Sequence, residues 1–199
     1  MPGIKDYPRV VVNFNPQIPP LKKIKHNTKI DVRYAVISPF AFIHIYWDPK
    51  EYEVIYEVEE PVLTEAERKY RDQILPAMRD MINFDIVVER DQEKLLEYID
   101  KRFKIIAFEL GLNLSYESYK KIYYYLVRDF IGFNEIEPML RDFFVEDIEC
   151  NGVEGHVYVI HRVFRNLKTN LIFKDMNRRE SFVEKLAQRS GKYISYASP

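Results

Sequence analysis

Alternating apolar positions in the first third of the chain predict β-strands. Over residues 41–47 successive side chains would point to opposite faces of an extended backbone. One face carries Ile43, Ile45 and Trp47, and the other carries Phe42, His44 and Tyr46. A turn at residues 48–51 separates this run from a second alternating run that reaches about residue 60. Period-two patterning with β-branched and aromatic residues is typical of strands. Residues 33–60 are therefore predicted to form a β-hairpin.

Helical spacing follows the hairpin. Thr64 and Glu67 have the spacing of a capping box, in which each side chain satisfies a free N–H of the first turn. The helix is expected to run to about residue 83, with a kink at Pro76 because proline removes a helical hydrogen bond.

Two more helices are predicted, from about 91 to 111 and from about 115 to 132. Their apolar residues recur every three or four positions, which marks a face turned to a core. These residues are Leu95, Ile99, Phe103, Ile106 and Leu110, and then Tyr119, Ile122, Tyr123, Leu126 and Phe130. Gly111 and Gly132 are expected to end the two helices. Short connections predict a three-helix bundle lying against the hairpin.

The pattern changes again near residue 136. The expected order is a short turn or helix at 136–140, a strand at 145–150 ending in an Asn-Gly turn, a second hairpin from 157–164 and 167–173, and a helix from 175 to 190. The fold class is thus α+β, an N-terminal β-hairpin with a helical bundle followed by a small antiparallel-sheet plus helix module. We place the boundaries at 1–30, 31–132 and 133–199.

Residues 1–30 are rich in proline and lysine and predict an extended leader with short ordered pieces. Its lysines, Lys22, Lys23, Lys25 and Lys29, suit either a solvated segment or contact with an acidic partner or lipid headgroups. Four lysines are few for electrostatic anchoring, which favours the solvated segment.

Composition narrows the function classes. The 199 residues carry 30 Lys and Arg against 31 Asp and Glu, a net charge of −1, which argues against a nucleic-acid coat. A single cysteine excludes a disulfide framework and indicates a reducing compartment. The N-terminus has no apolar stretch typical of a signal peptide, and no run approaches the roughly 18 apolar residues of a membrane span. We expect a cytoplasmic protein.

Glycine is scarce, with six in the chain, and no glycine-rich phosphate loop is present. The Gly-Lys pair at 191–192 lacks the first glycine of a P-loop, because Leu186 stands there. Tyr193 replaces the Ser or Thr that would bind magnesium. The chain therefore contains no P-loop and no catalytic residue of an ATPase.

The other candidate groups predict no active site. His156 and His161 are an odd number of residues apart on one strand and face opposite sides, so no metal site is expected. Cys150 is interpreted as a small buried hydrophobe. Glu146, Asp147 and Glu149 are interpreted as structural or interface residues, since nothing gives two of them distinct environments.

Basic residues of the C-terminal module are less easily explained. Arg178 and Arg179 occupy the first turn of the last predicted helix, where the helix dipole disfavours cations. The second hairpin interleaves basic and aromatic side chains, a faint version of a nucleic-acid-binding sheet face: His161, Arg162, Arg165 and Lys168 with Tyr158 and Phe164. Its charge is too low for that function, and no nucleic-acid partner is expected.

A set of ordered motifs begins after Tyr125. It comprises LVRDFIG at 126–132, IEPMLRD at 136–142, EDIECNG at 146–152, VYVIHR at 157–162, TN at 169–170 and LAQRSGK at 186–192. In order and spacing these resemble the N-terminal region of archaeal type II/IV secretion ATPases, the GspE-like and FlaI-like motors of pili and archaella. Members of that family continue past the equivalent of Ser198 and Pro199 into a linker and a RecA-like ATPase domain. The resemblance implies that this chain ends at the linker to such a domain.

The resemblance also implies a hexamer that is peripheral at the inner face of the cell membrane. ATP and Mg would be needed by the full-length protein and no cofactor by this chain. Basic residues of this domain would approach the terminal phosphate, with Arg189 first, Lys192 second and Arg162 third. The implied partners are the RecA-like domain, neighbouring subunits and an integral membrane platform protein.

Two alternatives remain open. One is a free-standing protein-interaction module of a secretion or pilus system without motor activity. The other, supported by less, is an accessory domain that binds single-stranded nucleic acid through Arg162 and Arg165.

Overall fold

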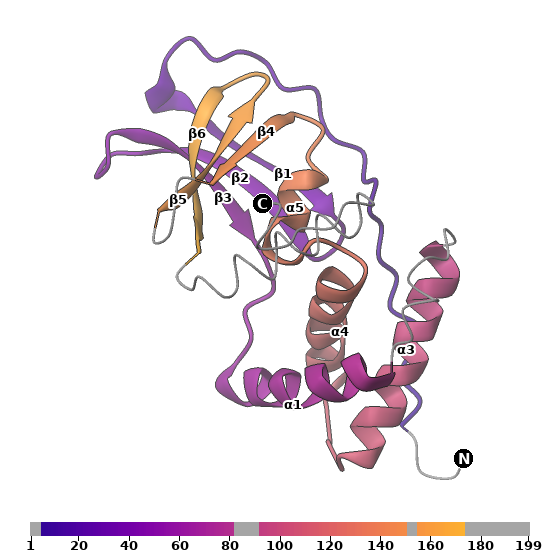
Figure 1. The fold of residues 1–199 in the computed structure, drawn as a ribbon. Coiled ribbons are helices and arrows are strands. Elements are labelled where there is room, and N and C mark those ends of the chain that lie inside the picture. Colours follow the sequence, from indigo (N-terminus) through magenta and orange to yellow (C-terminus); the bar gives the residue numbers. More distant parts are fainter. Residues whose placement is uncertain (1–4, 82–91, 151–154, 174–199) are drawn as a thin grey trace, which may run out of the picture. The chain divides into compact units, whose positions relative to one another are not determined.

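The computed structural model describes residues 5–81, 92–150 and 155–173, and they have the α+β fold that the sequence predicts (Figure 1). The chain divides into two compact units. A helical unit comprises Met1–Val11 with Pro61–Gly132, and a sheet unit comprises Val12–Glu60 with Phe133–Pro199. The sheet unit therefore combines strands that the sequence analysis assigned to two successive modules.

Three helices form the described part of the helical unit: α1 (Glu65–Met81), α3 (Gln92–Glu109) and α4 (Tyr116–Phe130), each in contact with the other two. The predicted capping box is confirmed at the start of α1. The Thr64 N–H donates to Glu67 Oε2 at 2.7 Å, and the Glu67 N–H donates to Thr64 Oγ1 at 3.2 Å. Pro76 lies within this helix.

The expected end of α3 at Gly111 is confirmed, whereas the C-cap of α4 is Ile131 and not Gly132. Gly111 follows α3 with φ of 64°, a left-handed conformation that favours glycine, and the Leu112 N–H donates back to the Ala107 carbonyl at 2.8 Å. Ser115 caps α4 by accepting a hydrogen bond from the Ser118 N–H at 3.1 Å. The apolar stripe of α3 is buried from Leu95 to Ala107, whereas Leu110 lies beyond the helix and is exposed.

The first part of the leader packs into the helical unit. Tyr7 and Val10 are buried in the helical unit, where the Tyr7 ring stacks on Tyr119 at 4.1 Å between centroids. The Tyr7 hydroxyl donates to the Leu114 carbonyl at 2.9 Å. Tyr119 in turn stacks on Phe103 at 4.5 Å. These residues form one of the short ordered pieces that the sequence predicts, and the four leader lysines, Lys22, Lys23, Lys25 and Lys29, are exposed.

The described strands of the other unit form one sheet in the order β1-β2-β3-β6-β5-β4. Their bounds are β1 (Asp31–Ile37), β2 (Ala41–Asp48), β3 (Glu53–Glu59), β4 (Val145–Cys150), β5 (His156–His161) and β6 (Arg165–Ile172). The predicted hairpin at 33–60 is a three-stranded antiparallel meander with β1 as its first strand. Ile43 and Ile45, which share one face of the predicted alternation, are buried.

A short parallel seam joins the two halves of the sheet. β3 and β6 pair only at Ile55 with Lys168 and at Tyr56 with Thr169. Beyond this ladder the Asn170 side chain continues the join: its amide donates to the Val58 carbonyl, and its oxygen accepts from the Val58 N–H, both at 3.0 Å. All other strand pairs are antiparallel.

The short helix expected at 136–140 is present as a 3-10 turn (Asn134–Ile136) followed by α5 (Glu137–Leu140), which contacts β1, β2 and β4. Glu137 is buried and accepts from Arg141 Nε at 2.6 Å and from the Phe133 N–H at 2.8 Å. The Asn-Gly turn and the helix expected at 175–190 lie outside the described residues. None of the described helices has the length and apolar character needed to cross a membrane.

Candidate functional site

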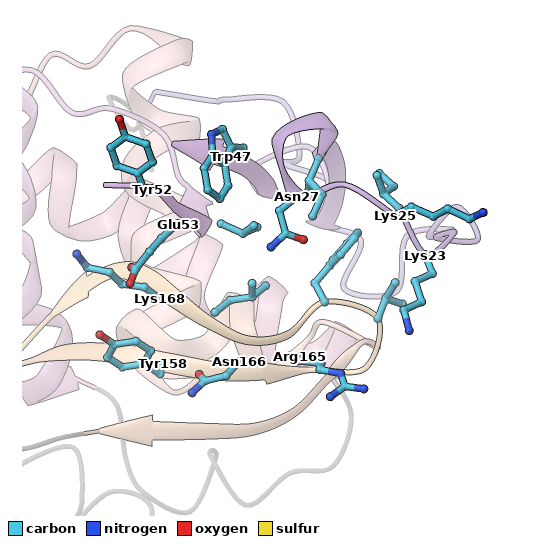
Figure 2. A pocket seen from close by; sticks show the side chains of 16 residues that line it. Lys23, Lys25, Asn27, Trp47, Tyr52, Glu53, Tyr158, Arg165, Asn166 and Lys168 are labelled. Atoms are coloured by element: carbon cyan, nitrogen blue, oxygen red, sulfur yellow. The ribbon is translucent and has the colours of Figure 1, made fainter. Parts of the chain in front are cut away.

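An open groove of about 910 Å³ lies in the sheet unit (Figure 2). The leader contributes one wall, the ends of the β2–β3 turn contribute another, and the start of β6 with its preceding turn contributes the rest. Its most distinctive side chains are Lys23, Lys25, Arg165, Trp47, Tyr52 and Tyr158. We call this the basic-aromatic groove.

The groove exists because the seam between β3 and β6 is short, with only two residue pairs between the strands. Both strands begin before their first mutual pair, at Glu53 and at Arg165, so residues 53–54 and 165–167 do not pair with each other. Each of these strands is held on its other side, β3 by β2 and β6 by β5. The sheet is therefore open between the starts of the two strands, and the groove lies there.

Tyr52 in the β2–β3 turn and Arg165 at the start of β6 line the groove with unusual backbone conformations. Tyr52 and Arg165 have φ of 55° and 67°, in the left-handed region that side chains other than glycine rarely adopt. Arg165 follows the three-residue β5–β6 turn, where a left-handed residue closes a hairpin and glycine is usual. The left-handed conformation costs about 1 kcal/mol at each position, and both residues line the groove.

The charges in the groove are unevenly compensated. The Lys168 ammonium pairs with the Glu51 carboxylate, and this contact raises the pKa of Lys168. Within the described part of the chain, Lys23, Lys25 and Arg165 form no ion pair. In Figure 2 these three cations lie on one side of the pocket, and Tyr52, Glu53 and Tyr158 lie on the other. This side of the groove is built to attract an anion.

A buried polar cluster occupies the interior of the same unit. Asp142, which follows α5, is buried and accepts three hydrogen bonds: from the Tyr34 hydroxyl at 2.6 Å, the Tyr56 hydroxyl at 2.9 Å and the Phe144 N–H at 2.9 Å. Burial raises the pKa of the Asp142 carboxyl, and the hydrogen bonds act in the opposite direction. Burial also raises the pKa of both tyrosines, with the nearby carboxylate adding to the effect.

His161 completes this cluster at the end of β5. Its Nδ1 accepts from the N–H groups of Val163 and Phe164, both at 3.2 Å, so the neutral ring carries its proton on Nε2. Nε2 lies 3.4 Å from the Tyr34 oxygen and donates to it, while Tyr34 donates onward to Asp142. Burial, with a smaller contribution from Arg162, lowers the pKa of His161 to about 4.

The cluster and the groove differ in what they can do. Asp142 and His161 are enclosed by protein, with each polar atom satisfied, so the cluster fixes the turn after β5 against β1 and β3. It presents no group to a substrate. The groove is accessible and lined by cations and aromatic rings without a nucleophile and base in contact, which suits binding.

The predicted phosphate-approach residues are only partly described. Arg162 lies in the β5–β6 turn, half exposed, with Nε 3.2 Å from Glu146 Oε1 and its guanidinium 4.8 Å from the centre of the Phe143 ring. Its charge is thus already compensated. Arg189 and Lys192, together with Arg178 and Arg179, lie outside the described residues.

Strand β4 carries the cysteine and the acidic residues that the sequence analysis considered. Cys150 is exposed, so the prediction of a buried hydrophobe was wrong: β4 is an edge strand, and Cys150 is its last residue. The register of β4 against β5 shifts between Val145 and Asp147. Among the described residues, no three His, Cys, Asp or Glu side chains gather as metal ligands would.

Sequence reasoning found part of the groove and missed the rest. It singled out Lys23 and Lys25 in the leader and Arg165 and Lys168 in the second hairpin, without a reason to bring them together. It assigned Tyr52 to a strand, whereas this residue lies in the turn before β3 and is exposed. No signal in the sequence separates Tyr52 from that strand, because it continues the alternation of Val54, Tyr56 and Val58.

These features define an α+β protein of two units whose accessible site is a basic-aromatic groove on the sheet unit. The chain is 35% identical over 181 residues to the protein named Uncharacterized protein MJ1288 from Methanocaldococcus jannaschii, a match that covers 90% of this chain and 71% of that protein. The chain belongs to the same family as MJ1288.

A second relative from the same organism is longer. Uncharacterized protein MJ0900 is 30% identical over 197 residues, and the match covers 90% of this chain but only 35% of that protein. No protein-family model matches the chain.

Proposed function

We propose that this chain is the N-terminal regulatory and interface domain of a hexameric secretion ATPase of the GspE-like and FlaI-like class, which drives assembly of a type IV pilus-like filament or an archaellum. The observation that carries the proposal is that separate motif blocks meet in the fold. Asp142 belongs to the block at 136–142 and His161 to the block at 157–162, and Tyr34 contacts both. The motif blocks therefore belong to one folded unit, as expected if together they characterise a domain.

The length of a relative supports the same proposal. The part of MJ0900 that resembles this chain is about a third of that protein, and the remainder leaves room for a RecA-like ATPase domain. In this arrangement the present domain contributes no catalytic residue. The RecA-like domain makes most of the contacts to ATP and Mg²⁺. The N-terminal domain covers the bound nucleotide and moves against the RecA-like domain.

The basic residues have distinct roles in this proposal. Arg189 and Lys192 approach the terminal phosphate, where a cation stabilises the charge that develops during phosphoryl transfer. Arg162 is less suited, because reaching a phosphate requires it to leave Glu146 and Phe143. The outer surfaces of the two units serve for contact with neighbouring subunits and with an integral membrane platform protein at the inner face of the membrane.

The decisive experiment measures ATP hydrolysis and oligomeric state of the full-length gene product. We expect a P-loop, G-x-x-x-x-G-K-S/T, in the protein and a hexamer with ATP. Arg189→Ala should lower turnover by tenfold or more with the hexamer intact, as expected for loss of one charge-stabilising contact. Arg68→Ala, which removes an exposed cation from α1, serves as the matched control and should leave turnover unchanged.

Each alternative result has a defined meaning. Unchanged turnover in Arg189→Ala removes this residue from the nucleotide site. A gene product without a P-loop that neither hydrolyses ATP nor associates with an ATPase subunit contradicts the motor proposal and leaves the free-standing interaction module.

A further inference from the structure

We propose that the basic-aromatic groove binds an extended acidic peptide segment of a partner protein. This inference goes beyond the proposed function and does not depend on it, because every residue involved belongs to the described sheet unit. It rests on the charges of the groove, on the open strand edges along it and on the strained residues that line it.

Charge identifies the sign of the ligand. Lys23, Lys25 and Arg165 lie at one side of the groove without an acidic partner among the described residues, in a protein whose overall charge is −1. Three uncompensated cations converging on one concave surface attract an anionic ligand and lose that attraction as salt increases.

The opening in the sheet identifies the shape of the ligand. Residues 53–54 of β3 and 165–167 of β6 face the groove without pairing to each other. An extended chain can lay its backbone along such edges and form strand-like hydrogen bonds, as peptides do when they add to a sheet. The side chains of the bound peptide would then alternate toward and away from the groove.

The aromatic residues of the groove indicate that the peptide carries apolar side chains beside its acidic ones. The Trp47 and Tyr52 rings meet edge to face at 6.5 Å, and the Tyr52 side chain is 78% exposed. An apolar side chain of the peptide can pack on these rings while an acidic one reaches Arg165. The strained φ of Tyr52 and Arg165 holds both groups at the groove, and such strain concentrates at binding sites.

A peptide fits this surface better than a nucleic acid or a nucleotide. Glu53 lies among the aromatic residues, where it would repel the phosphates that accompany stacked bases. A peptide can place its acidic groups against the cations alone and present apolar or hydrogen-bonding groups to Glu53. Asn27 and Asn166, which also line the groove, suit backbone or amide contacts.

Trp47 makes the proposal directly measurable, because it is the one tryptophan of the chain and lines the groove. The probe is a tryptophan-free decapeptide of alternating acidic and apolar residues, acetyl-EVEVEFEVEV-amide, titrated into the 199-residue protein. We expect a saturable change in Trp47 emission that weakens with added salt. The same peptide with lysine in place of every glutamate should produce no saturable change.

Charge-reversed variants test the location. Arg165→Glu should weaken binding by roughly tenfold or more, and Lys25→Glu by a smaller factor. Lys50→Glu is the matched control, since Lys50 is an exposed cation of the neighbouring β2–β3 turn that does not line the groove, and it should change affinity less than twofold. Arg165→Gln provides a second, milder variant whose far-ultraviolet circular dichroism is compared with that of the parent.

Three outcomes would overturn the proposal. The first is the absence of a saturable change with the acidic peptide. The second is binding that Arg165→Glu and Lys50→Glu weaken equally, which would indicate a diffuse charge effect. The third is tighter binding of ten-nucleotide oligo-dT or of ATP with the same dependence on Arg165, which would make the groove a phosphate site.

Discussion

The phenolic oxygen of Tyr34 lies 2.6 Å from Oδ2 of Asp142, although 108 residues separate them in the chain. Tyr56 donates to the same oxygen, so one buried carboxylate joins β1 and β3 to the segment after α5. The carboxylate thus connects three segments of the sheet unit that are far apart in the sequence.

Asp142→Ala should lower the free energy of unfolding by about 3 kcal/mol or more, because it leaves two buried hydroxyls and the Phe144 N–H without their acceptor. Urea unfolding followed by circular dichroism measures the change. Asp147→Ala, at an exposed position on β4, is the control and should stay within about 0.5 kcal/mol. Equal effects of the two substitutions would mean that the buried cluster contributes little.

The lowered pKa of His161 predicts a loss of stability in mild acid. The unfolded ring takes up a proton near pH 6.5 and the folded ring only near pH 4, so the unfolded state binds more protons between these values. The contribution of His161 is therefore complete above pH 6.5 and is lost as the pH falls toward 4, by about 3 kcal/mol at most. The raised pKa of Asp142 acts in the opposite sense, since its contribution is lost as the pH rises.

The comparison that isolates His161 is the urea midpoint of the parent and of His161→Asn, measured from pH 4 to 7. Asparagine keeps an acceptor for the Val163 and Phe164 N–H groups and does not titrate. The variant should lose the acid-dependent decline, whereas His26→Gln, at an exposed histidine, should keep it. A parallel pH profile in the parent and His161→Asn would contradict the assignment.

Val10→Ala should destabilise the helical unit by roughly 1–2 kcal/mol, because a buried branched side chain is shortened. Val11→Ala is a closely matched control, since the next side chain is 74% exposed, and should have almost no effect. Thermal unfolding of both variants tests whether the first part of the leader, up to Val11, stabilises this unit. Two indistinguishable melting temperatures would show that residues before 12 do not contribute.

Arg165→Gly should separate stability from binding. Glycine adopts the left-handed φ without strain but adds freedom to the unfolded chain, so the free energy of unfolding should be unchanged or higher by up to about 1 kcal/mol. Acidic-peptide binding, in contrast, should weaken. Arg162→Gly should reduce stability, because it loses the contacts to Glu146 and Phe143. A lower free energy of unfolding in Arg165→Gly would contradict the inference that the backbone is strained at this position.

Local signals account for the parts of the fold that the sequence predicted. The Thr64–Glu67 pair and Ser115 act within one turn, and alternation over 41–47 reflects a strand with one buried face, so neither depends on distant residues. The seam between β3 and β6, the Tyr34–Asp142 contact and the groove depend on segments more than one hundred residues apart. No spacing in the sequence encodes which segments meet, so these features had to come from the structure.

The seam has a further consequence for how the protein is made. β3 ends at Glu59, and its partner β6 begins only at Arg165, with the three described helices of the helical unit between them. During synthesis the chain must therefore complete α1, α3 and α4 before the inner edge of β3 can be closed. The helical unit, built from contacts close in sequence apart from residues of the leader, can fold first. Until residue 169 has left the ribosome, the first three strands present an open edge to the cell.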